Sequence, residues 1–137
     1  MVDALSAVHK LLRPGGLLID VRPDPKRRAR IEHLRGGARR VVGEVETKRS
    51  RAVDDRAAGA AIDTVLRQGE FTVSEHGHYW FRVSFDDRVS LEGYLRGSRR
   101  LSSMVWTDDA MRQAPAWATD RFALRRSLAY QVLRAQR

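Results

Sequence analysis

The stretch Leu11-Leu12-Arg13-Pro14-Gly15-Gly16-Leu17-Leu18-Ile19-Asp20-Val21 decides the fold class. Apolar side chains at helical spacing lead into it and predict a helix over residues 2–13. Because proline lacks a backbone donor and glycine tolerates positive φ, Pro14-Gly15-Gly16 ends that helix. The short, nearly apolar run at residues 17–21 is typical of a strand buried on both faces of a parallel sheet. A helix, a sharp turn and a buried strand predict an α/β protein.

A hairpin and a second helix follow this fragment. Short apolar runs at residues 31–34 and 41–45 flank Gly36-Gly37, a pair that predicts a tight turn between two strands. Helical spacing then predicts a helix over residues 51–67, with Ser50 as its N-cap. Both elements extend the α/β pattern.

Two long strands dominate the C-terminal half. Residues 71–85 alternate between apolar and polar side chains, which predicts a half-buried strand. The pattern at residues 122–133 predicts another strand, although a helix over residues 123–134 also fits it. Between these strands we expect a short helix capped by Asp86 or Asp87, a mobile segment and a further helix, at residues 89–95, 97–103 and 108–113.

These elements predict one domain over residues 1–137 with an α/β fold. Its sheet is expected to have about three main strands, with flanking helices and a small added β-hairpin. With 137 residues and 42% hydrophobic residues, the chain is long and apolar enough to bury a core.

The chain is strongly basic, with 26 Lys and Arg residues against 17 Asp and Glu residues and a net charge of +9. Such an excess favours anionic partners, nucleic acid included. However, only three of the basic residues are lysines, and the arginines occur in scattered pairs, often beside acidic residues. The sequence therefore favours a solvated arginine-rich surface over a nucleic-acid site, which stays open as an alternative.

Aromatic side chains gather in the C-terminal half, where arginines flank them. Such groups can stack on nucleic-acid bases or on a planar ligand. A role in the core explains them better, because alternating strand positions account for most of them. The side chains in question are Trp80, Trp106, Trp117, Tyr79, Tyr94 and Tyr130.

No set of side chains predicts catalysis or metal binding. His76 and His78 point to the same side of a strand, but two ligands are too few for a metal ion, and an outward polar face explains them better. Adjacent carboxylates such as Asp54-Asp55 do not face each other on a helix. Neither Ser6 nor Ser127 lies in a Gly-x-Ser-x-Gly motif, so a hydrolase has no support.

Several classes of protein are excluded by composition. Cysteine is absent, so disulfides, thiolate metal sites and a cysteine nucleophile are excluded. No apolar run reaches the ~18 residues of a membrane span, and the first residues form no continuous apolar signal sequence. We therefore expect a cytoplasmic protein without a membrane partner.

The order of the elements resembles the C-terminal half of class I S-adenosylmethionine-dependent methyltransferases. The residues that carry the resemblance are ALSAVHKLLRPGGLLID at positions 4–20. In that family a helix ending in a hydrophobic-Lys/Arg-Pro-Gly-Gly phrase leads into the fifth strand. A helix and two long antiparallel strands follow there. They would correspond here to residues 51–67, 71–85 and 122–133.

The resemblance implies a truncated Rossmann-like fold without a cofactor site. The family binds its cofactor through a glycine-rich turn after the first strand and an acidic residue that ends the second. This chain would begin at the fourth helix, and none of its ten glycines forms such a turn. We expect no cofactor-binding residue and no methyltransferase activity of this chain alone. S-adenosylmethionine would bind only if a partner chain supplied the site.

Three functions follow as hypotheses. The preferred one is a non-catalytic binding or assembly module. The second is the substrate-side half of a split methyltransferase, completed by a separate cofactor-binding subunit. The third is an arginine-rich nucleic-acid-binding protein.

Arg22 and Asp24 are the expected substrate-binding residues. They follow the strand at residues 17–21, and ligands sit at the carboxyl ends of parallel strands in α/β sheets. Alanine at either position is expected to leave folding intact and to change only the activity of a complete complex.

A homodimer is also expected. Without a fourth strand, residues 17–21 form an apolar edge strand, and the preceding helix leaves Leu5, Val8 and Leu12 partly exposed. A second copy would cover both surfaces across a two-fold axis. In the competing monomer, the hairpin or the helix folds over that edge instead.

Overall fold

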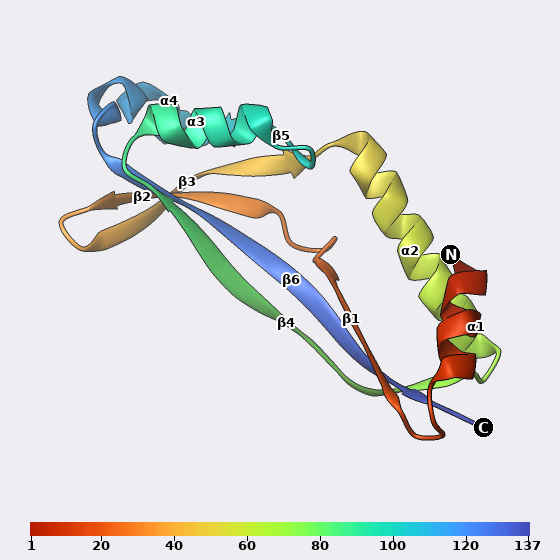
Figure 1. The fold of residues 1–137 in the computed structure, drawn as a ribbon. Coiled ribbons are helices and arrows are strands. Elements are labelled where there is room, and N and C mark those ends of the chain that lie inside the picture. The colour runs from red at the N-terminus through yellow and green to blue at the C-terminus, as the bar shows by residue number, and fades with distance from the viewer. The chain divides into compact units, whose positions relative to one another are not determined.

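The computed structural model describes residues 1–137 and divides into two compact units, whose elements are labelled in Figure 1. The terminal unit, named for the two chain ends that it holds, consists of Met1–Asp24, Ala52–Tyr79 and Leu128–Arg137. The central unit consists of Pro25–Arg51 and Trp80–Ser127.

The chain contains four α-helices and six strands, so the predicted mixture of α and β structure is confirmed. In chain order the elements are α1 (Val2–Leu11), β1 (Leu17–Pro23), β2 (Ala29–Arg35), β3 (Ala38–Thr47), α2 (Arg49–Arg67), β4 (Phe71–Phe85), α3 (Arg88–Gly97), β5 (Leu101–Trp106), α4 (Asp108–Gln113), the 3-10 helix η1 (Ala114–Trp117) and β6 (Arg121–Ala135). Three of them, α2, β4 and β6, have residues in both units. None of the helices combines the length and the apolar character needed to cross a membrane.

The six strands belong to one antiparallel sheet, which corrects the expectation of about three main strands. Strand β6 pairs with β1, β2 and β4, and β3 and β5 extend the sheet beyond β2. The predicted hairpin is therefore part of the sheet and not an addition to it. Strand β5 begins within residues 97–103, the segment expected to be mobile. Ser102 and Ser103 interrupt its apolar pattern, so the sequence signal of a strand is weak there.

In the terminal unit, β1 is an end strand with β6 as its neighbour. The two strands pair antiparallel, from Leu17 opposite Arg134 to Pro23 opposite Leu128. The prediction of an edge strand is confirmed, whereas the prediction of a parallel strand buried on both faces is wrong. Its apolar run is continuous, yet helices cover only one of its faces, so alternate residues are exposed.

Helices α1 and α2 supply the covered side of the terminal unit. In Figure 1, α1 lies alongside the C-terminal half of α2. As the sequence predicts, Leu5, Val8 and Leu12 of the first helical segment are only partly buried. The buried core of this unit consists of Ile62, Val65, Phe71, Leu133 and Ala135.

Backbone geometry explains the ends of both helices. Gly15 adopts a φ of 77°, so the predicted stop after α1 is confirmed. At Gly16 an added Cβ would lie 2.9 Å from the carbonyl oxygen of Arg13. The prediction of Ser50 as an N-cap is wrong. Helix α2 begins at Arg49, so Ser50 lies inside its first turn and does not precede it. The Arg51 amide donates to the Lys48 carbonyl at 2.9 Å in this turn.

In the central unit, the predicted hairpin is confirmed. Gly36 and Gly37 have φ values of 57° and 81°, and two successive residues with positive φ are what a type I′ turn requires. The N-terminal half of β6 pairs antiparallel with β2, and β5 pairs antiparallel with β3. Helices α3, α4 and η1 share one hydrophobic core with the strands of this unit. The core includes Ile31, Val42, Phe85, Leu91, Leu95, Trp117, Phe122 and Leu124.

Apart from the segment at residues 97–103, the C-terminal predictions are confirmed with one exception. Asp87 caps α3, because its Oδ1 accepts a hydrogen bond from the Ser90 amide at 2.7 Å. Residues 122–133 lie in a strand, and the alternative helix over residues 123–134 does not form. The exception is part of β4. Phe71, Phe81, Val83 and Phe85 of the expected inward side are buried or partly buried, but Val73, Glu75 and Tyr79 on that side are exposed.

Candidate functional site

The predicted substrate residues lie at the end of β1. Arg22 belongs to the strand itself, and its Nε donates to Asp20 Oδ2 at 2.8 Å. Its guanidinium lies against α2, where a Cβ at Gly59 would be 3.6 Å from Nη1. Asp24 is buried and interacts with other groups of the chain. The rule that ligands sit at strand ends applies to parallel strands, whereas β1 is antiparallel to β6. Substrate binding by Arg22 and Asp24 stays a prediction.

The face of β1 that points away from α2 carries a row of exposed apolar side chains. Leu17, Ile19 and Val21 are 50%, 63% and 49% exposed, values that are high for aliphatic residues of a small domain. Because residues directly opposite in an antiparallel pair share a face, Val132 and Tyr130 of β6 lie beside Ile19 and Val21, and Arg134 lies beside Leu17 at one end. We call Leu17, Ile19, Val21, Tyr130 and Val132 the apolar face.

Within the apolar face, Tyr130 links β6 to β4. Its hydroxyl donates to Glu75 Oε1 at 2.8 Å, and this hydrogen bond to a carboxylate raises the pKa of the phenol. The ring occupies the space above Gly77, where an added Cβ would lie 3.0 Å from it. His76 and His78 on the same strand are exposed.

Two histidines that have no evident partner in the sequence are both hydrogen-bonded. His9 Nε2 donates to the carbonyl of Gln136 at 2.8 Å in the terminal unit. In the central unit, His33 Nε2 donates to Asp120 Oδ2 at 2.7 Å, and its ring stacks on Trp117 at 4.2 Å between centroids. His33 is buried and ties β2 to the residues before β6, so the pair has a structural role.

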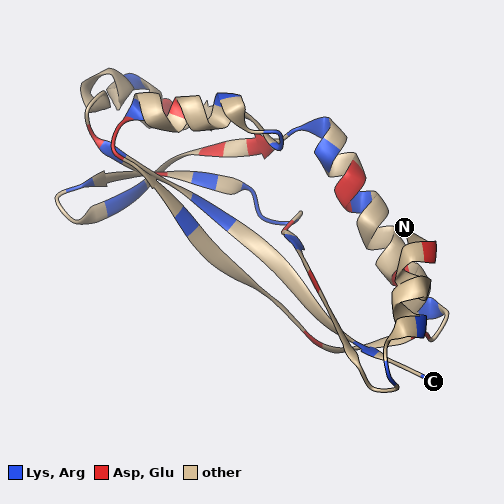
Figure 2. Ribbon diagram, in the orientation of Figure 1, with Lys and Arg blue, Asp and Glu red and all other residues tan.

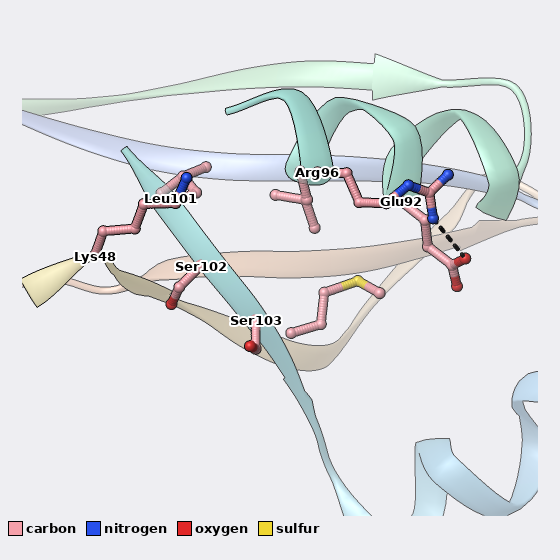
Figure 3. A pocket seen from close by; sticks show the side chains of 8 residues that line it. Lys48, Glu92, Arg96, Leu101, Ser102 and Ser103 are labelled. Atoms are coloured by element: carbon pink, nitrogen blue, oxygen red, sulfur yellow. Dashed lines mark ion pairs between the residues drawn. The ribbon is translucent and has the colours of Figure 1, made fainter. Parts of the chain in front are cut away.

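A pocket of about 400 Å³ lies between α3, β5 and the end of β3 in the central unit (Figure 3). Its charged groups are already engaged within the chain. Lys48 Nζ donates to the Ser98 carbonyl at 2.5 Å, and Glu92 pairs with Arg88 at 2.6 Å and with Arg96 at 4.0 Å. The pocket therefore offers an apolar floor and two hydroxyls, without a reactive group.

The other face of the central sheet is lined by arginines. Strand register places Arg30 opposite Arg125 and Leu34 opposite Arg121, with Glu32 between them on the same face. Alternate residues of these strands, such as Ile31 and Phe122, belong to the core under the helices. Figure 2 shows basic residues on β2, β4 and β6. We call this surface, with Arg39, Trp80 and Arg82, the arginine face.

The sequence missed the arginine face because its members are distant along the chain. The signal that reveals it is the alternation of apolar and charged residues over residues 29–32, together with the two arginines that flank the apolar residues 122–124. Pairing of β2 with β6 then brings the alternate residues of both strands together on one surface.

No group of three or more His, Asp or Glu side chains is placed to hold a metal ion. No protein-family model matches the chain, and no curated protein matches it in sequence. Its function is therefore inferred from its exposed surfaces.

Proposed function

We propose that this chain is a methyltransferase-like assembly module without a cofactor site of its own, and that it assembles through β1 with a second copy of itself. The observation that carries the proposal is the apolar face on an end strand. Unpaired backbone groups of an edge strand form a template for another strand, and proteins usually protect such edges with charge, proline or a covering segment.

The exposed side of β1 lacks those protective features along most of its length. Leu17, Ile19 and Val21 carry no charge, and the first proline comes at Pro23, the last residue of the strand. The charges of β1 belong to Asp20 and Arg22, which neutralise each other at 2.8 Å. Burial of exposed aliphatic side chains stabilises an interface by about 25 cal/mol per Å² of apolar area.

A second copy fits this surface because a two-fold interface must be complementary to itself. Antiparallel pairing of two β1 strands about Ile19 would place Ile19 opposite Ile19 and Leu17 opposite Val21. No like charges would meet on that face. The paired Asp20 and Arg22 would add no net charge to the interface.

The resemblance to class I methyltransferases suggests a competing occupant of the same edge. Under the resemblance, β1, β4 and β6 correspond to the fifth, sixth and seventh strands, and the antiparallel pairing of β1 with β6 is compatible with that order. The fourth strand would then belong beside β1. A separate cofactor-binding subunit would supply it, and the chain alone would be a monomer.

Light scattering at micromolar concentration tests the proposal. The expected mass is twice the chain mass of 15.6 kDa, and calorimetry of the chain with S-adenosylmethionine is expected to show no binding at micromolar concentration. A monomer would contradict self-association and favour the separate subunit. Binding of the cofactor by the chain alone would contradict the absence of a cofactor site.

Ile19→Lys tests the interface itself. Lysine placed in the middle of β1 is expected to reduce the dimer to monomers, because it would place two like charges directly opposite each other at the two-fold axis. Val105→Lys is the matched control, since Val105 is a 52% exposed residue on β5, the end strand of the central unit. A dimer that survives Ile19→Lys, or one that dissociates equally in the control, would show that β1 is not the interface.

A further inference from the structure

The arginine face of the central unit presents cations that the fold does not neutralise. Arg30 and Arg125 are directly opposite each other on β2 and β6. Like charges at directly opposite positions destabilise a sheet, so this pair is costly unless another group offsets it. Selection for stability alone would not place two arginines at these opposite positions.

Trp80 contacts both of these guanidinium groups. The Cζ of Arg125 is 4.4 Å from the centroid of the Trp80 ring, and the Cζ of Arg30 is 5.7 Å from it. These cation–π contacts orient the guanidinium groups but do not cancel their charge. A flat guanidinium held against an indole is a platform on which a further planar group can stack.

One atom of this cluster is left without a partner. The Nε of Arg125 is buried and has no hydrogen-bond acceptor. Buried donors are nearly always paired in native structures, so an unpaired one indicates a missing acceptor. The neighbouring Arg82 shows the contrast, because it donates to both oxygens of buried Glu32, at 2.7 and 3.2 Å, and this bond raises the pKa of Arg82.

The arginine face continues to the turn of the β2–β3 hairpin. A pocket of about 310 Å³ there is lined by Arg35, Arg39, Arg121 and Ser84. The one ion pair of Arg121 at this end is weak, since its Nε is 3.8 Å from Asp86 and both side chains are exposed. A strand rises about 3.3 Å per residue, so Arg121 and Arg125 are about 13 Å apart along β6.

We propose that the arginine face binds single-stranded nucleic acid. Bases stack on Trp80 and its flanking guanidinium groups, while phosphates bind the arginines from Arg125 to the hairpin pocket. Aromatic rings that hold bases, set in a positively charged surface that follows the backbone, are the common elements of single-strand binding sites. The site is independent of the β1 assembly surface.

Two features favour this ligand class. The cations are spread over β2, β3 and β6, as a polyanion requires, whereas a small anion would need an enclosed site. Stacking on Trp80 requires bases that are free of a duplex stack. An acidic peptide would use the charge but not the indole, so it is the main competitor to be tested.

Fluorescence anisotropy with labelled oligonucleotides tests the proposal. The probes are single strands of oligo-dT and oligo-rU about 20 nucleotides long, the corresponding DNA duplex, and polyglutamate, each at about 50 and 200 mM salt. Tighter binding of either single strand than of the duplex and polyglutamate is expected. Equal or tighter binding of polyglutamate, or no binding at low salt, would overturn the proposal.

A pair of double variants separates this surface from net charge. Arg30→Gln with Arg125→Gln is expected to weaken single-strand binding by about tenfold and to reduce the salt slope by about 0.7 for each phosphate that is no longer neutralised. Arg56→Gln with Arg99→Gln removes the same charge from exposed positions on α2 and after α3. Equal weakening by both pairs would mean that only net charge matters, which overturns the site.

Tryptophan fluorescence provides a readout that does not depend on the folding of those variants. In the unmodified chain, stacking of a base on Trp80 is expected to quench emission on addition of oligo-dT. The quench should disappear in Trp80→Phe, which still stacks and still binds, and persist in Trp106→Phe. A quench that persists in Trp80→Phe would overturn the role of Trp80.

Ile19→Lys distinguishes the proposal of self-association through β1 from that of nucleic-acid binding by the arginine face. This variant lies in the terminal unit and is expected to retain single-strand binding while it loses self-association. If binding were lost together with the dimer, the arginine face would not be an independent site.

Discussion

The apolar face and the arginine face are both uncovered surfaces of the sheet, and they differ in chemistry. In each unit, helices cover one face, and alternate residues of the strands form the other. In the terminal unit those residues are Leu17, Ile19 and Val21, whereas in the central unit they include Arg30 and Arg125. The same strand geometry therefore supports a surface for another protein strand in one unit and a surface for a polyanion in the other.

The two units also differ in the size of their cores. The terminal unit has five buried core residues. None of them lies on α1, whose apolar side chains are only partly buried where they pack against this core. The central unit has 13 buried core residues from strands and helices. The terminal unit is therefore expected to depend more strongly on each of its buried side chains.

The largest expected effect comes from deleting a core side chain of β6 in each unit. Leu133→Ala and Leu124→Ala both remove a side chain that is fully buried, at an expected cost of about 2–5 kcal/mol. Hydrogen exchange should show faster exchange in the terminal unit for Leu133→Ala and in the central unit for Leu124→Ala. Leu11→Ala, at a position 85% exposed, is the control and should change stability by less than about 0.5 kcal/mol. Equal acceleration throughout by either variant would mean that the two units open together.

A smaller effect is expected in the central unit, where β3 and β5 approach each other closely. An added Cβ at Gly43 would lie 2.7 Å from the carbonyl oxygen of Val105, so Gly43→Ala must shift the strands and cost about 1–3 kcal/mol. Gly93→Ala in α3 is the control, because its nearest neighbour is the flexible end of Arg96 at 3.9 Å. Alanine should stabilise that helix by about 0.5–1 kcal/mol. Urea unfolding measures both, and a loss of stability in Gly93→Ala would contradict the steric explanation.

The smallest expected effects are opposite responses of the two units to pH. The pKa of Tyr130 is raised by its hydrogen bond to Glu75, so its contribution to the terminal unit is complete below the usual tyrosine pKa of about 10. That contribution is lost as the pH rises through the raised value. In the central unit, the Ser90 amide lowers the pKa of Asp87, and Arg40 lowers that of Asp109. Their contributions are complete above the usual aspartate pKa of about 3.9 and are lost as the pH falls through the lowered values.

Hydrogen exchange in alkaline and acidic buffers measures this difference, after correction for the intrinsic exchange rate. Tyr130→Phe should remove the alkaline weakening of the terminal unit, and Asp87→Asn should remove part of the acid weakening of the central unit. Alkaline weakening that persists in Tyr130→Phe would assign it to another group.

Local sequence signals were sufficient for most of the elements. Pro14-Gly15-Gly16 and Gly36-Gly37 place their turns because glycine is the residue that adopts positive φ without strain. Alternation predicts β4 with its correct bounds, and Asp86-Asp87 predicts the start of α3, where Asp87 is the cap. These signals are read within a few residues, so they need no knowledge of the fold.

Strand partners and surfaces were decided by the tertiary structure alone. A continuous apolar run at Leu17–Pro23 indicates a strand, but only its pairing with β6 and the helices on one side decide that its other face is exposed. Likewise, Arg30, Trp80 and Arg125 are distant in sequence and meet because β2, β4 and β6 are neighbours in the sheet. The sequence by itself determined where most of the strands and helices form, because propensity and turn geometry are local. Which residues share a surface depends on pairing between distant segments, and only the folded chain specifies that pairing.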